Sequence, residues 1–156
     1  MKKIFLIVLV AVLFSSCAKK CDYNECNIVA PSSEIAAVQS YLTSNNITAT
    51  QHCSGLFYAI DQEGSGKRPN GCSTVSVNYV GKLTNGTVFD QTAAGQPAQF
   101  GLGDVITGFT NGIIQLKAGS KVRLYIPPSL GYGNKQVGSI PANSILIFTL
   151  ELVSVQ

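Results

Sequence analysis

The chain has very few residues of the kinds that most often carry acid–base or metal chemistry. It contains one histidine, His52, and only 12% of its 156 residues are charged. No motif places a nucleophile and an acid around that histidine, so the sequence shows no catalytic triad. The cysteines lack the paired C-x-x-C spacing that is typical of zinc sites. A metal site that uses His52 remains an alternative, but we predict that neither a metal nor another cofactor takes part.

Positive charge is also scarce. The formal net charge is +3 at pH 7, and loss of Lys2 and Lys3 with an N-terminal signal would remove two of these charges. No basic patch then remains that could bind nucleic acid. There is no internal repeat and no low-complexity segment, and the hydrophobic content of 46% suits one globular domain.

Residues 1–16 have the features of an export signal. Two lysines precede an apolar run from Ile4 to Phe14, and two serines follow it. The run is short for a transmembrane helix. Cys17 comes next and resembles the cysteine of a bacterial lipobox, although Phe14 stands where leucine is usual. The alternative is a plain secretory signal in which Cys17 is incidental.

The lipobox resemblance predicts a location in the cell envelope. A lipid on Cys17 would anchor the chain to a bacterial membrane on its periplasmic side. The residue after Cys17 is not acidic, which favours the outer membrane by the rule for enteric bacteria.

Four further cysteines indicate disulfides, because an even number in an exported chain usually pairs. Four cysteines allow three connectivities, and the sequence does not choose between them. Cys53 and Cys72 precede two predicted strands and flank the polar, glycine-rich stretch 61–71. We predict the pairs Cys53–Cys72 and Cys21–Cys26.

The pattern predicts three segments after the signal. Residues 17–30 show no period and are predicted to be a lipidated tether. Residues 31–50 carry a helix over 32–45, which Ser32 or Ser33 caps and the pair Asn45-Asn46 ends. Residues 51–156 form the main domain. Three apolar residues at helical spacing form one face of the helix: Ile35, Val38 and Leu42.

Most of the main domain shows the two-residue alternation of half-buried strands. Strands are predicted at 56–60, from Val75 through a hairpin turn at Asn85-Gly86, at 121–126 and at 146–152. A proline pair, Pro127-Pro128, ends the third of these. A helical segment is predicted over 108–119, with a C-terminal cap at Gly119. Its apolar face is formed by Phe109, Ile113 and Leu116.

The run from Val75 to Leu152 resembles the FKBP-type peptidyl-prolyl isomerases, or immunophilins. Three motifs carry the resemblance in the family's order: VNYVGKLTNGTVFD, FGLGDVITGFTNGIIQLKAGSKVRLYIPPSLGYG and IPANSILIFTLEL. The resemblance implies an α+β fold, in which an FKBP-like antiparallel sheet wraps around one short central helix. The helix at 32–45 is an addition at the N-terminus.

The resemblance also implies one hydrophobic cavity. The catalytic residues carried over from the family are Tyr79, Phe89, Asp90 and Tyr132. The substrate-binding residues are Phe100, Val105, Ile106, Phe109, Ile140 and Phe148. The sequence departs from the family pattern at Phe109, usually tryptophan, and at Ala98, where many members have another aromatic residue. The histidine that many members carry after the Tyr-Gly pair is absent.

These residues also have ordinary structural roles. Aromatic residues in strands are usually core residues, and Asp90 could bond backbone N–H groups in the turn that follows it. The resemblance favours an isomerase that acts on proline-containing exported polypeptides, binds macrolides, and works as a monomer. The alternative is a non-catalytic module that holds apolar or proline-containing segments in the same cavity.

Overall fold

The computed structural model describes residues 21–156, so the predicted export signal and the lipidation at Cys17 lie outside the described residues. The described chain forms one antiparallel sheet of seven strands. Its helices are α1 (Ser32–Ser44), α2 (Thr107–Ile113) and the 3-10 helix η1 (Pro128–Leu130). The strands are β1 (Thr50–Gln51), β2 (Phe57–Gln62), β3 (Thr74–Leu83), β4 (Val88–Gln91), β5 (Ala98–Gly101), β6 (Lys121–Ile126) and β7 (Leu146–Val155). None of the helices described is long and apolar enough to cross a membrane.

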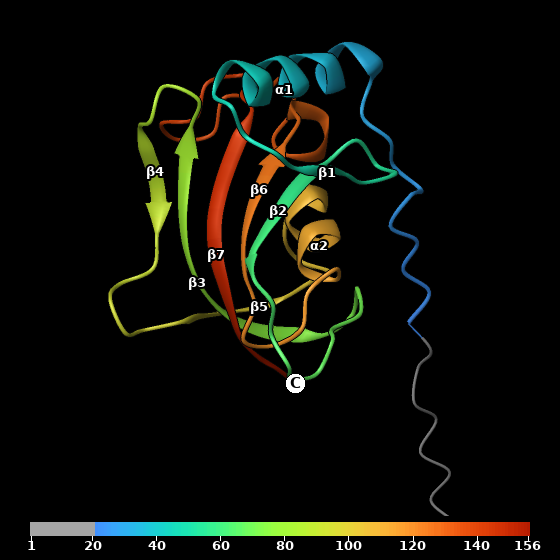
Figure 1. The fold of residues 1–156 in the computed structure, drawn as a ribbon, viewed down its shortest axis with the longest axis vertical. Helices are drawn as coiled ribbons and strands as arrows, with labels where there is room; N and C mark the ends of the chain where they lie inside the picture. The colour runs from blue at the N-terminus through green and yellow to red at the C-terminus, as the bar shows by residue number, and fades with distance from the viewer. Residues whose placement is uncertain (1–20) are drawn as a thin grey trace, which may run out of the picture.

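The strands lie in the order β1-β2-β6-β7-β3-β4, and β5 also pairs with β3 (Figure 1). The long strand β3 therefore has β7 on one side and two short strands on the other. β5 pairs with its first half, Thr74–Val77, and β4 with Val80–Lys82. We call this side of β3 the divided edge, because two separate strands pair with it. Tyr79 lies in the gap between them.

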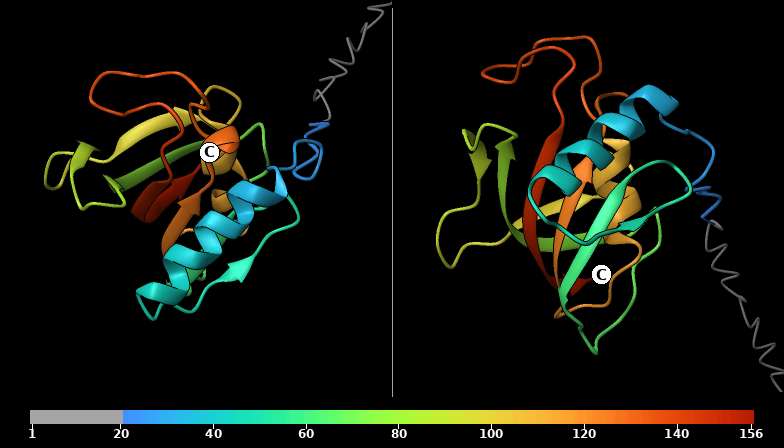
Figure 2. Two further views of the ribbon diagram at one scale, coloured as in Figure 1. Left: turned by 90° about the horizontal axis from the view of Figure 1, so that it is seen from above. Right: turned by 45° about the horizontal axis from the view of Figure 1, so that its top comes forward.

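The two faces of the sheet bury different side chains, as the alternation predicts. On β6, Leu124 and Ile126 belong to the main core beneath α2, whereas Tyr125 between them packs with Val38 and Leu42 of α1. The two helices consequently lie on opposite faces of the sheet (Figure 2). This arrangement confirms the predicted α+β fold with a central helix and an added N-terminal helix.

Helix α2 lies unusually close to β6, because glycines occupy the side of the helix that meets the strand. A Cβ atom at Gly108 would lie 2.3 Å from Ile126 Cγ2, and one at Gly112 would lie 2.5 Å from Leu124 Cδ1. Real Cβ atoms do not approach other heavy atoms this closely, so a side chain at either position would push the helix away from the sheet.

The predicted helix over 32–45 is confirmed, but its capping is not. The N-cap residue is Pro31, no side chain caps the helix, and both serines lie inside it. The central helix is shorter than predicted and ends at Ile113. Gly119 has φ +92° and donates its N–H to Leu152 O at 2.6 Å, so it shapes a turn onto β7 rather than capping the helix. Strands β1 and β5 were not predicted.

The predicted disulfide pairs are wrong. Cys21 pairs with Cys72, and Cys26 pairs with Cys53, with Cα–Cα distances of 5.9 and 5.6 Å. Proximity in sequence suggested the other pairing, but the fold brings the N-terminal cysteines beside the main domain. Both bonds therefore join the N-terminal segment to the domain, and neither closes the 61–71 stretch.

Residues 21–30 do not form a tether, because they dock against α2 and the neighbouring loops. The Tyr23 hydroxyl donates to Asn111 Oδ1 at 2.5 Å, and Asn111 Nδ2 donates to Glu25 O at 2.9 Å. Gln115 Nε2 donates to the Glu25 carboxylate at 2.8 Å. The Ala30 N–H donates to Ser54 O at 2.8 Å. We call residues 21–30 the N-terminal clasp.

We expect the two disulfides to contribute separately to stability. They span 51 and 27 residues, and the chain-entropy model assigns about 4 kcal/mol to loops of either length. Cys21→Ser/Cys72→Ser and Cys26→Ser/Cys53→Ser should each lower the free energy of unfolding by about 2–4 kcal/mol in urea titrations. Peptide mapping without reduction should recover only the two observed pairs. A fragment linking Cys53 to Cys72 would contradict the structure.

Candidate active site

A cavity of about 430 Å³ opens on the concave side of the sheet, between the β3–β4 region and the start of α2. It is lined mainly by apolar and aromatic side chains. All ten residues that the resemblance placed in the cavity line it: Tyr79, Phe89, Asp90, Phe100, Val105, Ile106, Phe109, Tyr132, Ile140 and Phe148. Their catalytic and binding roles stay predictions, because the geometry shows position alone.

Phe109 forms the floor of the cavity. It lies on α2, its side chain is only 4% exposed, and the contact between the α2 glycines and β6 sets its depth. Its ring packs edge-on against Phe148 and Phe100, with centroids 5.2 and 6.1 Å away. Edge-to-face contacts of this kind stabilise aromatic clusters beyond simple burial. The floor is therefore a rigid surface of ring edges and faces.

Tyr79 and Asp90 form the polar wall. The Tyr79 hydroxyl donates to Asp90 Oδ2 at 2.5 Å. The two residues come from β3 and β4, whose register pairs Asp90 with Gly81. Thr92 holds the backbone at the divided edge, since its N–H donates to Tyr79 O at 3.0 Å and its Oγ1 accepts from the Tyr79 N–H at 3.1 Å.

Gly81 makes room for the Phe89 ring. A Cβ atom at this position would lie 2.6 Å from Phe89 Cε2 and 3.0 Å from Phe148 Cε1. The two rings meet edge-on at 5.5 Å above this glycine. A side chain at position 81 would displace Phe89, the neighbour of Asp90, and so disturb both the apolar and the polar walls.

The outer rim comes from the segment after η1. Tyr132 is 37% exposed and Val137 is 41% exposed, whereas Ile140 is buried. Val137 and Ile140 form an isolated antiparallel bridge. The Val137 N–H donates to Ile140 O with an N–O distance of 3.0 Å, and the Ile140 N–H donates to Val137 O at 2.9 Å, so the rim segment folds back on itself. The rim thus presents one phenol hydroxyl and one apolar side chain to an incoming ligand.

Four lining residues were missed by sequence reasoning: Asp104, Val137, Gly138 and Ser139. Asp104 directly precedes Val105 and Ile106, so the motif that located those residues could have located it as well. The other three lie in the rim segment, where the sequence departs from the family and carries no alternation. Ala98, noted as a departure, is not among the residues that line the cavity.

Partial burial raises the pKa of Tyr79 above the ordinary tyrosine value, and the hydrogen bond and negative charge of Asp90 raise it further. The hydroxyl therefore stays protonated throughout the physiological range and continues to donate to the carboxylate. The arrangement combines an apolar slot with fixed hydrogen-bonding groups. None of the lining residues described is a histidine or a cysteine.

Comparison with known proteins identifies this architecture. Residues 66–153 match the family model described as FKBP-type peptidyl-prolyl cis-trans isomerase. The chain belongs to this family. A curated FkpA isomerase from Aeromonas hydrophila is 39% identical over 123 residues, covering 76% of this chain and 45% of the relative. FkpA from Escherichia coli K12 is 44% identical over 103 residues, covering 65% of this chain and 38% of the relative.

Solved structures of the family agree in fold. A peptidyl-prolyl isomerase from Pseudomonas syringae matches with a TM-score of 0.70 and 30% identity, covering 81% of this chain and 97% of that one. The Escherichia coli FkpA crystal structure matches with a TM-score of 0.72 and 37% identity, covering 80% of this chain and 60% of that one. The chain thus spans less than half the length of these curated relatives but covers 97% of the Pseudomonas syringae peptidyl-prolyl isomerase chain.

The Tyr79–Asp90 pair predicts a pH response. Because the folded-state pKa of Tyr79 is raised, its contribution to stability is fully present below the ordinary tyrosine pKa of about 10. That contribution is lost as the pH rises above this value. Asp90→Asn removes the negative charge and should lower the pKa of Tyr79, measured from the ring-carbon NMR shifts. Asp61→Asn, which changes a carboxylate outside the cavity, should leave it unchanged. Equal Tyr79 titrations in both variants would contradict the assignment.

Proposed function

We propose that this chain is a peptidyl-prolyl cis-trans isomerase that accelerates rotation about X–Pro bonds in exported proteins. The observation that carries the proposal is the apolar cavity with Phe109 as its floor and the Tyr79–Asp90 pair in its wall. Family membership supports the same activity. The exported substrates are inferred from the N-terminal signal sequence, and the clasp disulfides are consistent with an oxidising compartment.

The chemistry needs no nucleophile. Rotation about a peptide bond breaks amide resonance against a barrier of about 18–20 kcal/mol. In the twisted amide the nitrogen regains its lone pair and the bond loses polarity, so an apolar, water-poor slot favours that state over the planar amide. Lowering the barrier by about 6 kcal/mol would accelerate rotation about 10⁴-fold. The aromatic floor and walls supply this environment and hold the proline ring.

Polar groups around the slot would orient the substrate. Tyr132 at the rim has an exposed hydroxyl that can donate to a substrate carbonyl. Ile106 directly precedes α2 and lines the cavity, and its carbonyl accepts the Phe109 N–H at 3.0 Å. Its own N–H would donate to a second substrate carbonyl, as the resemblance to the family implies. Asp90 holds the Tyr79 hydroxyl and keeps negative charge beside the slot. These three residues would fix the backbone on either side of the rotating bond.

The test separates the role of the polar wall at Asp90 from that of the buried aromatic ring of Phe148. Asp90→Ala should lower turnover on an X–Pro peptide by about tenfold, equivalent to about 1.4 kcal/mol in the barrier, because it removes the negative charge beside the slot and the acceptor that fixes the Tyr79 hydroxyl. Its stability should change little, because Asp90 is exposed. Phe148→Ala removes a buried ring and should reduce both turnover and stability, the latter by about 3–5 kcal/mol. Glu63→Ala, which removes an exposed carboxylate outside the cavity, is the matched control.

Exchange between cis and trans peptide, measured by NMR at equilibrium, reports turnover directly. Absence of acceleration by the folded wild-type protein would favour the alternative, a non-catalytic module that binds proline-containing segments in the same cavity. The departure at Phe109 supports that alternative. If Asp90→Ala accelerates exchange as much as the wild type does, Asp90 is not needed for catalysis, and another lining residue must orient the substrate. Chelators should have no effect on turnover, since the proposed chemistry uses no metal.

We further propose that a lipid on Cys17 anchors the chain to the outer membrane, facing the periplasm, and that the domain acts as a monomer. The lipobox-like sequence supports the anchor, and the burial of the α1 apolar face against its own sheet supports the monomer. Cys17→Ala should release the protein from the membrane fraction, whereas Ser16→Ala, which keeps a small residue, should not. A protein lacking residues 1–20 should sediment as a monomer. Membrane retention of Cys17→Ala, or a stable dimer, would contradict these proposals.

A further inference from the structure

The Cys21–Cys72 disulfide leaves very little free chain between the domain and the lipid proposed on Cys17. Only residues 18–20 separate Cys17 from Cys21. Cys21 is bonded to Cys72, just before β3 begins at Thr74. An extended chain spans at most about 3.6 Å per residue, so the four steps from Cys17 to Cys21 reach about 14 Å. A lipid on Cys17 would therefore keep the surface around Cys72 within about this distance of its attachment point.

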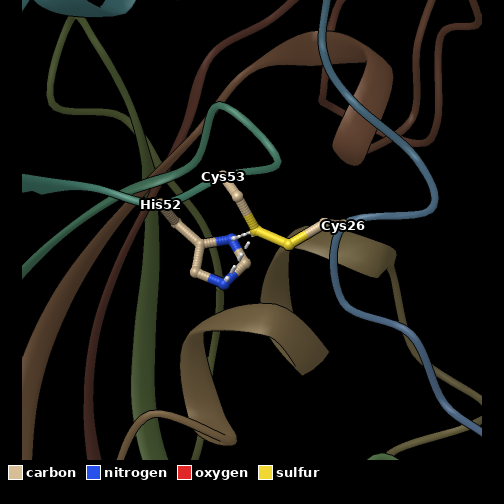
Figure 3. Close-up of side chains that lie close together, drawn as sticks. All are labelled: Cys26, His52 and Cys53. Atoms are coloured by element: carbon tan, nitrogen blue, oxygen red, sulfur yellow. Dashed lines mark hydrogen bonds between the residues drawn. A yellow bond between two sulfur atoms is a disulfide. The ribbon is translucent and has the colours of Figure 1, made fainter.

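The second disulfide stops the clasp from pivoting on the first. Cys26 is bonded to Cys53 in the loop between β1 and β2, beside the His52 ring (Figure 3). Between the two bonds, the Tyr23 hydroxyl donates to Asn111 on α2. The clasp consequently has one orientation on the domain. A lipid attached close to its start would determine which side of the domain meets the membrane.

Basic side chains gather on the surface beside Cys72. Lys67 and Arg68 lie on the loop that leads to Cys72, and Lys117 lies on a turn that packs against this loop. The Ala118 N–H donates to Lys67 O at 3.0 Å and joins the two segments. All three basic residues are exposed. We call Lys67, Arg68 and Lys117 the basic face.

The basic face is free to attract anions. Neither ion pair in residues 21–156 involves its side chains. Two exposed acidic residues of the same segments, Asp22 and Glu63, offset part of its charge, and two lysines that precede Cys21 in the sequence, Lys19 and Lys20, add to it. Basic residues therefore outnumber acidic ones on this side of the domain. Clusters of this kind beside a membrane attachment attract anionic headgroups within a Debye length of about 8–10 Å.

The polar wall of the cavity lies toward the other end of β3. The strand has ten residues, from Thr74 to Leu83, and at about 3.3 Å per residue it is about 30 Å long. Its far end pairs with β4, where Asp90 lies opposite Gly81. Figure 1 shows β3 beginning on the side of the clasp and ending beside β4. A membrane next to Cys72 would thus leave the polar wall of the cavity on the side that faces away from it.

We propose that the basic face lies against the anionic phospholipid headgroups of the membrane that carries the lipid on Cys17. The inference rests on the lipid anchor proposed above and not on isomerase activity. The lipid supplies the attachment, the Cys21–Cys72 disulfide limits the distance, and the basic face determines the side of the domain that meets the headgroups. The domain is therefore held against the membrane with its cavity directed away, instead of moving on a flexible tether.

Lysine acetylation of the lipidated protein, resolved by peptide mass spectrometry, tests the proposal. The protein is compared in a neutral detergent and in vesicles of phosphatidylcholine and phosphatidylglycerol in equal parts. Lys67 and Lys117 should react about fivefold more slowly in the vesicles, the factor that corresponds to the attraction of one basic residue to an anionic surface. Lys82 at the far end of β3 and Lys135 in the rim segment, both exposed, should react equally in both. Vesicles of phosphatidylcholine alone should protect Lys67 and Lys117 less.

Charge variants provide a second readout. Lys67→Glu/Arg68→Glu should return Lys117 to its rate in detergent, whereas the matched control Lys82→Glu/Lys135→Glu should leave Lys117 protected in the vesicles. Equal reaction of the four wild-type lysines in vesicles and in detergent would overturn the proposal, and so would protection of Lys82 and Lys135. A protein that does not float with the vesicles would overturn the lipid anchor together with this inference, whereas a floating protein with unprotected Lys67 and Lys117 would overturn the inference alone.

Discussion

The close contact between α2 and β6 is the constraint on which the candidate active site depends. Gly108 and Gly112 let the helix backbone approach Ile126 and Leu124 at distances that no side chain would permit. This approach sets the depth at which Phe109 lies beneath the concave face of the sheet. The aromatic walls are fixed relative to the sheet, so the distance from helix to sheet determines the volume between them. A cavity of this size is therefore a consequence of backbone packing as much as of the lining side chains.

The divided edge of β3 explains why a polar pair occurs in an otherwise apolar wall. β5 leaves the edge at Val77 and β4 joins it at Val80, so no neighbouring strand pairs with Tyr79 on that side. The Thr92 side chain and backbone satisfy the free groups of Tyr79 instead. The gap in strand pairing at this edge of β3 separates β4 from β5. No strand then lies between Asp90 on β4 and the Tyr79 hydroxyl, which donates to it.

The alternation of apolar and polar residues, together with the turn residues, predicted most of the sheet. It could do so because alternate side chains of a long strand point to opposite faces of the sheet, one covered by α2 and the other by α1. Strands β1 and β5 have only two and four residues, too few to carry a recognisable alternation. Periodicity marks Phe148 as buried, yet it cannot separate a core ring from a cavity ring, and only the motif resemblance placed it at a site. The pairing of Cys26 with Cys53 depends on how the clasp folds back, which local sequence does not encode.

The N-terminal clasp explains how so short a central helix keeps its position. α2 has seven residues, including two glycines and two threonines, and no side chain caps its start. Such a sequence has little helical propensity of its own, and short helices depend on tertiary contacts for stability. β6 holds one side of α2, and the aromatic cluster surrounds Phe109 on another. The clasp binds Asn111 on a third side and Gln115 in the turn that follows the helix. The two disulfides reduce the entropy lost when the clasp docks, so a few polar contacts suffice to keep it there. The cavity floor is thus held in part by residues that lie outside the span of the family model.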